Sequence, residues 1–484
     1  MLIKNENRIP LNQIQHADSI YLSEIQELDH ELFRSFGDSI LVDNNLTRKL
    51  VSFQASKSRS YYRWYKFKEA FSADLVEYIF NKYHFDSGRI LDPFAGSGTT
   101  LFASADMGYK STGIELLPVG QHLIKANLYS RIGNTKNLIS ELESFLSEKS
   151  WCREGERSTF NVLRITQGAY PEETCKKIQR YLSDIRKNAN ESQQILYFAL
   201  LCILESVSYT RKDGQYLRWD YRSGRSNGKS TFDKGKILDF DSAITGKLSE
   251  IIKDLYDKNI DENLLFKVDI NADDSEIELL SGSCLNILPK LSENAYSGIM
   301  TSPPYCNRYD YTRTYALEHA MLGIDEGELI NLRQSMLSCT VENKKKELLK
   351  INDAWSKALS ICDNTPLLQK ILTFLEYKKD KKELNNAGIS RMVRGYFYEM
   401  ACVIQESYRV LSKNSYMVMV NDNVRYAGVS ISVDLLLSSI ARDMGFSVEN
   451  ILVLPKGKGN SSQQMGSHGR DALRKCVYVW RKVK

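Results

Sequence analysis

The sequence is poor in paired cysteines, in clustered histidines and in long apolar runs, and each shortage excludes a class of protein. The nine cysteines are scattered, odd in number and never spaced as CxxC, which argues against a disulfide framework or a thiolate zinc site. The six histidines form no metal-ligand pattern. No run of about 18 apolar residues occurs, and the chain starts without the apolar core of a signal peptide. We therefore expect a cytoplasmic protein without a bound metal or a membrane partner.

The remaining composition is that of an ordinary globular protein. The chain has 484 residues, of which 42% are hydrophobic, so it can build two or three domains, or one domain with large insertions. Its net charge of +5 is a small excess for this length. Such a charge permits an acidic partner such as nucleic acid without requiring one.

Alternating strands and helices predict an α/β fold. A helix is expected within residues 64–83, and the pattern over residues 88–118 is typical of the opening of a doubly wound sheet. The elements expected there are a strand at 90–91, a glycine turn at 96–98, a helix at 99–107 and a strand at 111–114.

Two blocks interrupt this alternation, and we expect both to be mainly helical insertions. Residues 126–270 contain polar helices and a basic loop, and residues 326–386 are rich in lysine. Residues 1–60 are expected to form an N-terminal arm with a short helix near 19–36, and the Gly/Ser-rich stretch 456–470 is expected to be a mobile loop. The sheet domain would then comprise residues 61–125, 271–325 and 387–484.

A glycine turn follows the first expected strand. Gly96 and Gly98 would allow a ligand to approach the backbone closely, and Asp92 lies at the end of the strand. The fuller G-x-G-x-x-G pattern of a dinucleotide site is absent. Glu115, at the end of the second strand, is placed to accept hydrogen bonds from ribose hydroxyls, although an acidic strand end is more often a solvated surface residue.

A rigid tetrapeptide, Ser302-Pro303-Pro304-Tyr305, follows a later strand. Each proline fixes φ and removes a backbone donor, so the segment should be extended, with free carbonyls and a locked ring direction. Adjacent prolines can also simply terminate a strand beneath a packed aromatic ring. Rigidity of this kind suits the holding of a flat ligand.

Together these residues resemble the S-adenosylmethionine-dependent amino-methyltransferases of DNA over most of the chain outside the two insertions. The FxGxG cofactor loop of that family matches Phe94–Gly98, and its acidic ribose binder matches Glu115. Its S/D/N-P-P-Y catalytic tetrapeptide matches Ser302–Tyr305, and its K-x-x-F-S segment matches Lys68–Ser72. The matches occur in a consistent order.

The resemblance implies a class I, Rossmann-like methyltransferase fold with S-adenosylmethionine as cofactor. Family members usually have Asp where this chain has Ser283, and Asp where it has Ser297, so a modest cofactor affinity is expected if Ser283 does not replace the first carboxylate. Catalysis is assigned to Ser302, Pro303, Pro304 and Tyr305. The implied cofactor-binding residues are Lys68, Phe71, Ser72, Asp92, Pro93, Phe94, Gly96, Gly98, Thr99, Glu115 and Ser283.

The tetrapeptide has a chemical task in this family. An exocyclic base amine is a poor nucleophile because its lone pair is delocalised, so acceptors that draw its protons out of the ring plane favour attack. Ser302 Oγ and the Pro303 carbonyl would be those acceptors, and Tyr305 would stack on a base flipped out of the duplex. No Pro-Cys pair occurs, so the nucleophile of the cytosine-C5 class is missing, and Cys306 is expected to pack.

Two basic stretches are candidates for DNA contact. The stretch 209–229 alternates cations with aromatic residues, which suits phosphate contacts and base stacking, although a solvated hairpin would look the same. The stretch after the tetrapeptide could line the base pocket, clamp a phosphate or cap a helix. The lysine-rich block is expected to be a solvated helical face. The DNA-binding candidates are Arg211, Lys212, Arg218, Trp219, Arg222, Arg225, Asn307, Arg308 and Tyr309.

We therefore expect a site-specific methyltransferase acting on double-stranded DNA, and the serine at position 302 favours cytosine N4 as the target atom. The alternatives are N6-adenine methylation of DNA, base methylation of RNA, or a non-catalytic DNA-binding regulatory protein. The sequence leaves open the target site and whether a cognate restriction enzyme exists.

Overall fold

The computed structural model describes residues 11–187, 192–213, 217–225, 231–260, 276–455 and 474–483. The loop expected at 456–470 lies outside the described residues, as do 214–216 and 226–230 of the first basic stretch.

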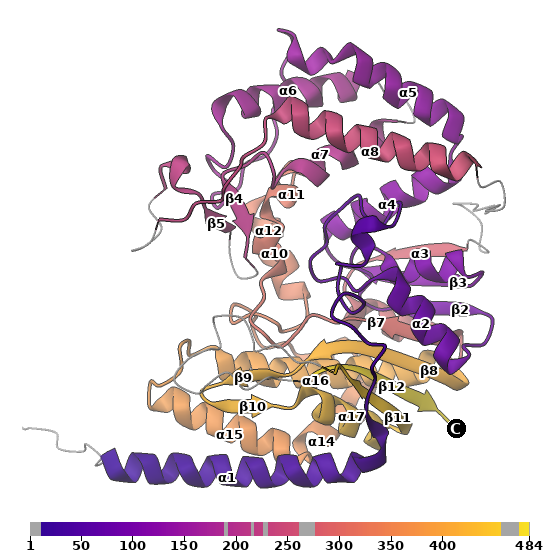
Figure 1. Ribbon diagram of the computed structural model, residues 1–484. Helices are drawn as coiled ribbons and strands as arrows, with labels where there is room; N and C mark the ends of the chain where they lie inside the picture. Colours follow the sequence, from indigo (N-terminus) through magenta and orange to yellow (C-terminus); the bar gives the residue numbers. More distant parts are fainter. Residues whose placement is uncertain are drawn as a thin grey trace, which may run out of the picture.

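An eight-stranded, mainly parallel sheet forms the centre of the protein (Figure 1). The strand β12 is antiparallel to both of its neighbours, and the other pairs are parallel. Its first residue therefore lies at the edge where the parallel strands end. In spatial order the strands are β1 (Ile40–Val42), β11 (Phe446–Val453), β12 (Lys475–Lys482), β8 (Leu411–Asp422), β7 (Tyr296–Thr301), β2 (Arg89–Asp92), β3 (Lys110–Glu115) and β6 (Ile277–Ser281).

The central strands contribute alternate residues to two separate cores, as strands buried on both faces do. Leu91 and Ile299 pack with α16 (Ile389–Val410) and α17 (Val433–Met444). Their neighbours Ile90 and Met300 belong to the other core, with α2 (Ala73–Tyr83) and α3 (Thr99–Asp106). The α/β alternation expected from the sequence is confirmed.

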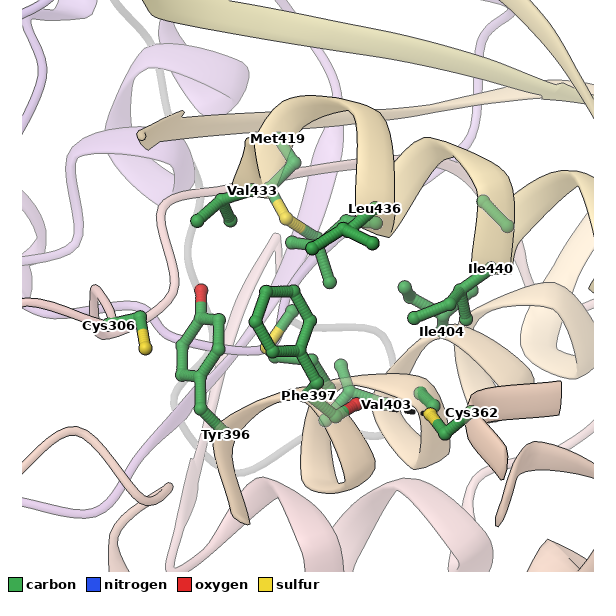
Figure 2. Close-up of a cluster of buried hydrophobic side chains, with 14 of the residues drawn as sticks. Cys306, Cys362, Tyr396, Phe397, Val403, Ile404, Met419, Val433, Leu436 and Ile440 are labelled. Carbon is green, nitrogen blue, oxygen red and sulfur yellow. Dashed lines mark hydrogen bonds between the residues drawn. The ribbon is translucent and has the colours of Figure 1, made fainter. Parts of the chain in front are cut away.

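Figure 2 shows part of the core that contains α16 and α17. Tyr396 and Phe397 of α16 point toward Val433 and Leu436 of α17, and Cys306, which follows the tetrapeptide, lies beside the Tyr396 ring. The residue that follows the tetrapeptide therefore packs into this apolar core.

The helix expected within residues 64–83 begins later than its apolar spacing indicated. Helix α2 begins at Ala73, because Ser72 is its N-cap and accepts a hydrogen bond from Leu75 N at 3.3 Å. Phe71, expected on the helical face, precedes the helix but is buried in the same core. Thus Ser72 stabilises the helix start, and its hydroxyl donates to the Leu50 carbonyl at 2.7 Å.

The described residues between β3 and β6 form helices and one small hairpin. In Figure 1 α5 to α8 form the top of the molecule, away from the sheet. The described elements are α4 (Pro118–Ile132), α5 (Thr135–Glu148), α6 (Glu172–Lys187), α7 (Gln193–Ile203), β4 (Thr210–Lys212), β5 (Leu217–Trp219) and α8 (Phe240–Ile260).

Further helices lie between β7 and β8, and α1 (Leu11–Phe36) runs beside α15 along the lower edge of Figure 1. The small hairpin of β9 (Val424–Tyr426) and β10 (Val429–Ile431) follows β8. A short helix, α9 (Cys284–Ile287), follows β6. The other helices are α10 (Tyr311–Thr314), α11 (Ala316–Met321), α12 (Glu326–Ser335), α13 (Leu348–Ile351), α14 (Ser356–Asp363) and α15 (Pro366–Asp380).

Candidate active site

A cavity of about 1030 Å³ lies at the edge of the sheet where the parallel strands end. Its lining brings together segments that are far apart in the sequence. Of the predicted cofactor-binding residues, only Ser72 and Gly98 are not part of the lining. The predicted cofactor-binding and catalytic residues that line the cavity are Lys68, Phe71, Asp92, Pro93, Phe94, Gly96, Thr99, Glu115, Ser283, Ser302, Pro303, Pro304 and Tyr305.

Glu115, the last residue of β3, holds its carboxylate against the glycine turn. Its Oε2 accepts a hydrogen bond from Gly96 N at 2.7 Å, and its Oε1 accepts one from Leu117 N at 2.6 Å. Burial raises the pKa of Glu115 to about 7, against the opposing effect of these two N–H groups. Each carboxylate oxygen keeps a further lone pair, so the ionised group can accept hydrogen bonds from a ribose.

Asp92 connects the glycine turn to the tetrapeptide Ser302–Tyr305. Its Oδ1 accepts hydrogen bonds from Phe94 N at 3.0 Å and from Thr301 Oγ1 at 2.6 Å. Thr301 ends β7 and directly precedes Ser302. Burial raises the pKa of Asp92 to about 6. The position of the turn relative to the tetrapeptide is therefore set by one buried carboxylate.

The glycine turn has a backbone that requires glycine. Gly96 has φ +56° and Gly98 has φ +83°, both in the left-handed region. A Cβ at Gly98 would lie 2.7 Å from the Phe102 ring, so this glycine permits close packing at the start of α3. Helix α4 also approaches the turn, because a Cβ at Gly120 would stand 2.5 Å from the Gly96 carbonyl oxygen. Together these contacts hold the backbone of Gly96 at the cavity.

Lys68 and Ser283 line the cavity with side chains that bond to other parts of the protein. Lys68 Nζ donates to the Lys212 carbonyl at 2.5 Å and lies 4.0 Å from the Glu205 carboxylate. Ser283 Oγ donates to the Ser335 carbonyl at 3.0 Å. Lys68 thus connects the cofactor segment to the first basic stretch.

The Ser302 hydroxyl faces two oxygen atoms. Its Oγ lies 3.2 Å from the carbonyl oxygen of Val420 and 3.2 Å from the Tyr305 hydroxyl. Because the carbonyl can only accept, Ser302 donates to Val420, and the tyrosine hydroxyl can then donate to Ser302. One Ser302 lone pair remains for a further donor.

Cys306 and Tyr426 hold the end of the tetrapeptide in place. The Tyr426 hydroxyl donates to the Cys306 carbonyl at 2.7 Å. The Cys306 side chain is fully buried, and burial raises the pKa of its thiol far above the usual range. The thiol therefore packs in the apolar core, where Figure 2 shows it beside the Tyr396 ring.

The first basic stretch forms the hairpin β4–β5. Arg211 and Arg218 are exposed and lie over the Phe232 ring, with guanidinium carbons 5.6 and 4.1 Å from its centroid. Arg218 also lines the cavity. These two cations are accessible to an acidic ligand.

Arg222, Arg225 and Trp219 of this stretch interact with neighbouring groups of the protein. Arg222 forms bonds of 2.6 and 2.9 Å to the two carboxylate oxygens of Asp220, which is fully buried. Arg225 lies 4.0 Å from the centroid of the Trp219 ring, which is itself buried. Within the structure these groups stabilise the turn after β5.

Lys212 is buried between the insertion and the sheet domain. Its Nζ donates to Glu318 Oε1 at 2.5 Å and to the Tyr65 hydroxyl at 2.9 Å. The Lys212 and Glu318 side chains are 4% and 1% exposed. The ammonium group therefore forms an interior ion pair, which leaves it little surface for a phosphate.

Asn307, Arg308 and Tyr309 all line the cavity. Asn307 Oδ1 accepts from Tyr309 N at 3.2 Å, and Arg308 has φ +65°. Arg308 Nε is buried without a hydrogen-bond partner among the described residues. The hydroxyls of Tyr309 and Tyr315 both donate to the Glu69 carboxylate, which links this loop to the cofactor segment.

Asp422 and Lys475 are cavity residues that the motifs did not reveal. Asp422 ends β8, and Lys475 begins β12 directly opposite it. A signal for Asp422 was available, since it ends an expected strand of the sheet, as Asp92 and Glu115 do. Lys475 gave no such signal, because the antiparallel direction of β12 is not visible in a local pattern.

Within the described part of the chain, no group of three or more His, Cys, Asp or Glu residues could hold a metal ion. No described helix is both long and apolar enough to span a membrane.

Comparison with known proteins decides the family. Residues 7–125 match the family described as DNA methylase. The chain is 54% identical over 474 residues to the type II methyltransferase M.AvaI of Nostoc sp., covering 98% of this chain and 97% of that protein. The chain belongs to the DNA methylase family. This methylase is also 39% identical over 466 residues to the type II methyltransferase M.BsoBI of Geobacillus stearothermophilus, with 90% and 88% of the two chains covered. No solved structure matches the chain.

Membership establishes the methyl donor of this methylase. The type II methyltransferases of the family are DNA amino-methyltransferases that use S-adenosylmethionine. The cavity fits that cofactor, because the Glu115 carboxylate, which keeps lone pairs able to accept from ribose hydroxyls, lies directly beside the Gly96 backbone at the cavity.

Proposed function

We propose that this methylase transfers the methyl group of S-adenosylmethionine to the N4 amine of cytosine at a specific site in double-stranded DNA. The observation that carries the choice of base is the neutral hydroxyl of Ser302, which lines the cavity between Val420 O and the Tyr305 hydroxyl. A hydroxyl can accept one amine proton while donating elsewhere, whereas an ionised carboxylate can only accept. Adenine also has an acceptor nitrogen beside its amine, so the choice of base is supported by the pattern of the family that the chain resembles, in which a serine at this position mostly accompanies cytosine N4 methylation.

In the proposed reaction the bound cofactor supplies an electrophilic methyl group. Ser302 Oγ and the Pro303 carbonyl accept the two protons of the amine, which favours a pyramidal nitrogen with an available lone pair. That lone pair would form the new N–C bond while the S–C electron pair leaves on sulfur, and the methylated amine would then release one proton to solvent. Tyr305 stacks on the flipped base and fixes its direction.

The proposed cofactor site is built around Glu115 and the glycine turn. Glu115 accepts the ribose hydroxyls, and the turn lets the cofactor approach the backbone. Asp92 sets the turn relative to the tetrapeptide. Lys68, Phe71, Pro93, Phe94, Thr99 and Ser283 complete the lining, while Ser72 and Gly98 act through the helix starts that they stabilise.

For DNA contact, the exposed arginines of the β4–β5 hairpin and Arg308 are the best-placed groups of those predicted. Arg211 and Arg218 are exposed, and Arg308 lines the cavity. A cognate restriction enzyme remains part of the proposal, because type II methyltransferases commonly protect sites that such an enzyme would cut.

In finer detail, we propose a doubly wound, class I sheet with two insertions. The packing of α2 and α3 against one face and of α16 and α17 against the other supports this arrangement. The proposed target-recognition insertion is 126–270, and the second insertion is 326–386. The proposed catalytic domain consists of 61–125, 271–325 and 387–484, together with β1, because the expected arm 1–60 contributes this strand to the edge of the sheet.

The test is chemical identification of the product. DNA methylated in vitro by the purified enzyme is digested to nucleosides, and the methylated nucleoside is identified by mass spectrometry against standards. We expect N4-methylcytosine. N6-methyladenine as the sole product would overturn the choice of base, and C5-methylcytosine would overturn the proposed amine chemistry as well. Base-resolution mapping of the same DNA gives the target site.

A further inference from the structure

Asp422 and Lys475 form an ion pair at the part of the cavity formed by β7, β8 and β12. These three strands are neighbours in the sheet, and the tetrapeptide, Asp422 and Lys475 all lie at the same edge. The cofactor residues of β2, β3 and β6 lie on the other side of β7. The ion pair is therefore on the side of the tetrapeptide where the base would bind.

The pair has hydrogen-bonding capacity that the described protein does not use. Lys475 Nζ lies 3.4 Å from Asp422 Oδ1 and 3.5 Å from Oδ2. Asp422 Oδ1 is buried without a hydrogen bond among the described residues. The Lys475 and Asp422 side chains are 29% and 36% exposed, and both residues line the cavity. An ammonium group has three N–H donors, so donors remain for a ligand.

The pair also lies near the tyrosine of the tetrapeptide. Burial raises the pKa of Tyr305, and the charges that act on it next are those of Lys475 and Asp422. Ser302 contacts the carbonyl of Val420, two residues before Asp422 on β8. A base stacked on Tyr305 with its amine at Ser302 would thus have its remaining polar edge toward the ion pair.

We propose that Lys475 donates hydrogen bonds to the ring acceptors of the target base, and that Asp422 orients and partly neutralises the ammonium group. This inference rests on the proposed cytosine chemistry. Beside its amine, cytosine carries two successive acceptors, N3 and O2, whereas adenine carries N1 and then a C–H group. A lysine at this place would therefore favour cytosine.

The carboxylate has a chemical reason to be there. An isolated ammonium group beside the ring would draw electron density from the amine and weaken its attack. Asp422, 3.4 Å from Nζ, reduces that effect while leaving the donors of Lys475 in place. The pair can therefore read the base without deactivating it.

The experiment compares cytosine with adenine at the mapped target position. Two duplexes that differ only in that base are methylated by wild-type enzyme and by Lys475→Met, and kcat/KM is measured for each. We expect the cytosine rate of the variant to fall by about 10- to 100-fold, as loss of a charged hydrogen bond predicts, with the cytosine-to-adenine ratio falling at least about tenfold. S-adenosylmethionine affinity should change less than about twofold, because the residue lies outside the proposed cofactor site.

The matched control is Lys82→Met. Lys82 forms a similar pair with Asp43, at 2.6 Å and 35% exposed, and it does not line the cavity. Its loss should leave both rates unchanged. A purely structural role of Lys475 would lower both rates equally, so an unchanged ratio in Lys475→Met overturns the inference while the wild-type product still tests the proposed function.

A second variant protects the test against misfolding. Asp422→Asn keeps the shape of the side chain and removes its charge. We expect it to lower cytosine methylation by about tenfold, the equivalent of about 1.4 kcal/mol, and to leave the preference for cytosine intact. Unchanged turnover in Asp422→Asn would overturn the role given to the carboxylate. A wild-type product of N6-methyladenine would instead overturn the proposed function and this inference with it.

Discussion

The two halves of the cavity differ in how completely their polar groups are bonded within the protein. The proposed cofactor half is the lining around Glu115 and the glycine turn, and the proposed base half is the lining around Asp422 and Arg308. In the proposed cofactor half, both oxygens of Glu115 accept hydrogen bonds from backbone N–H groups, and Asp92 bonds to its own turn and to Thr301. In the base half, Asp422 Oδ1 and Arg308 Nε lack hydrogen-bond partners among the described residues. The polar groups of the first half are held in place before a ligand binds, whereas those of the second half can still form hydrogen bonds with a ligand.

This difference follows from what each half has to hold. The cofactor is the same small molecule in every catalytic cycle, so its site can be preorganised without having to accommodate different ligands. A target base must first flip out of the duplex. Its unpaired polar edge then needs hydrogen-bonding groups that are not already paired within the protein. Substitutions in the two halves should therefore change different quantities, namely cofactor affinity in one and turnover in the other.

The largest effect is expected for Tyr305→Ala. Loss of the ring misplaces the flipped base, so kcat should fall by about 100-fold while S-adenosylmethionine affinity measured by calorimetry stays unchanged. Tyr305→Phe keeps the stacking surface and is the matched control, with turnover within about tenfold of wild type. Equal loss of cofactor binding and turnover in Tyr305→Ala would show that the two halves are not separable.

Glu115→Ala should show the opposite pattern. Removing the acceptor for the ribose hydroxyls is expected to weaken S-adenosylmethionine binding by about 2 kcal/mol, roughly 30-fold, in calorimetry. The protein should remain folded by circular dichroism. Glu278→Ala, on the neighbouring strand β6 and outside the cavity lining, should bind the cofactor as wild type does. Unchanged affinity in Glu115→Ala would remove Glu115 from the cofactor site.

The same carboxyl group should make cofactor binding depend on pH. The pKa of Glu115 is raised to about 7 by burial, and the ionised form is the better acceptor. Affinity for S-adenosylmethionine should therefore rise about tenfold between pH 6 and pH 8, and Glu115→Gln should abolish that rise. A wild-type affinity that is flat over this range would contradict the assignment.

The stability of the free protein should respond with the opposite sign. The folded-state pKa of Glu115 lies above its ordinary value of 4.5, so the folded protein binds the proton more tightly than the unfolded chain does. This contribution to stability is fully present below pH 4.5 and is lost as the pH rises through about 7. Comparing denaturant midpoints of wild type and Glu115→Gln isolates it.

The smallest effect is expected for the β4–β5 hairpin. Arg218 is exposed beside the cavity, so Arg218→Ala should weaken DNA binding a few-fold and reduce the slope of log affinity against log salt by about one. Arg222 is already paired with Asp220, so Arg222→Ala should leave the slope unchanged. The reverse result would mean that the ion pair opens on DNA and that Arg218 faces solvent.

The sequence revealed the cavity lining around the glycine turn and the tetrapeptide but not the lining from the ends of β8 and β12, for a physical reason. The glycine turn and Glu115 belong to one continuous strand-turn-helix-strand unit, whose local pattern is visible in residues 88–118. Asp422 and Lys475 meet only because β8 and β12 pair in an antiparallel register. Local spacing carries no information about that pairing.

Burial explains why the basic residues were harder to interpret. The stretch 209–229 shows alternating cations and aromatics, but Lys212 turns inward to Glu318 while Arg218 remains exposed. Neighbouring cations thus have different partners, because the acidic partner of the inward lysine lies on helix α11, which is distant in the sequence. Composition alone could not separate them.

The order of the strands also has a consequence for how the protein is made. Leu91 pairs with Ile299 across the centre of the sheet, and Ile40 pairs with Ile451 at its edge. Strands so distant in the chain can pair, and so offset the entropy lost in closing the long loop between them, only after most of the polypeptide has left the ribosome. Until then the first strands expose unpaired edges, which invite aggregation. The yield of folded enzyme should therefore rise with slower synthesis, lower temperature or added chaperones.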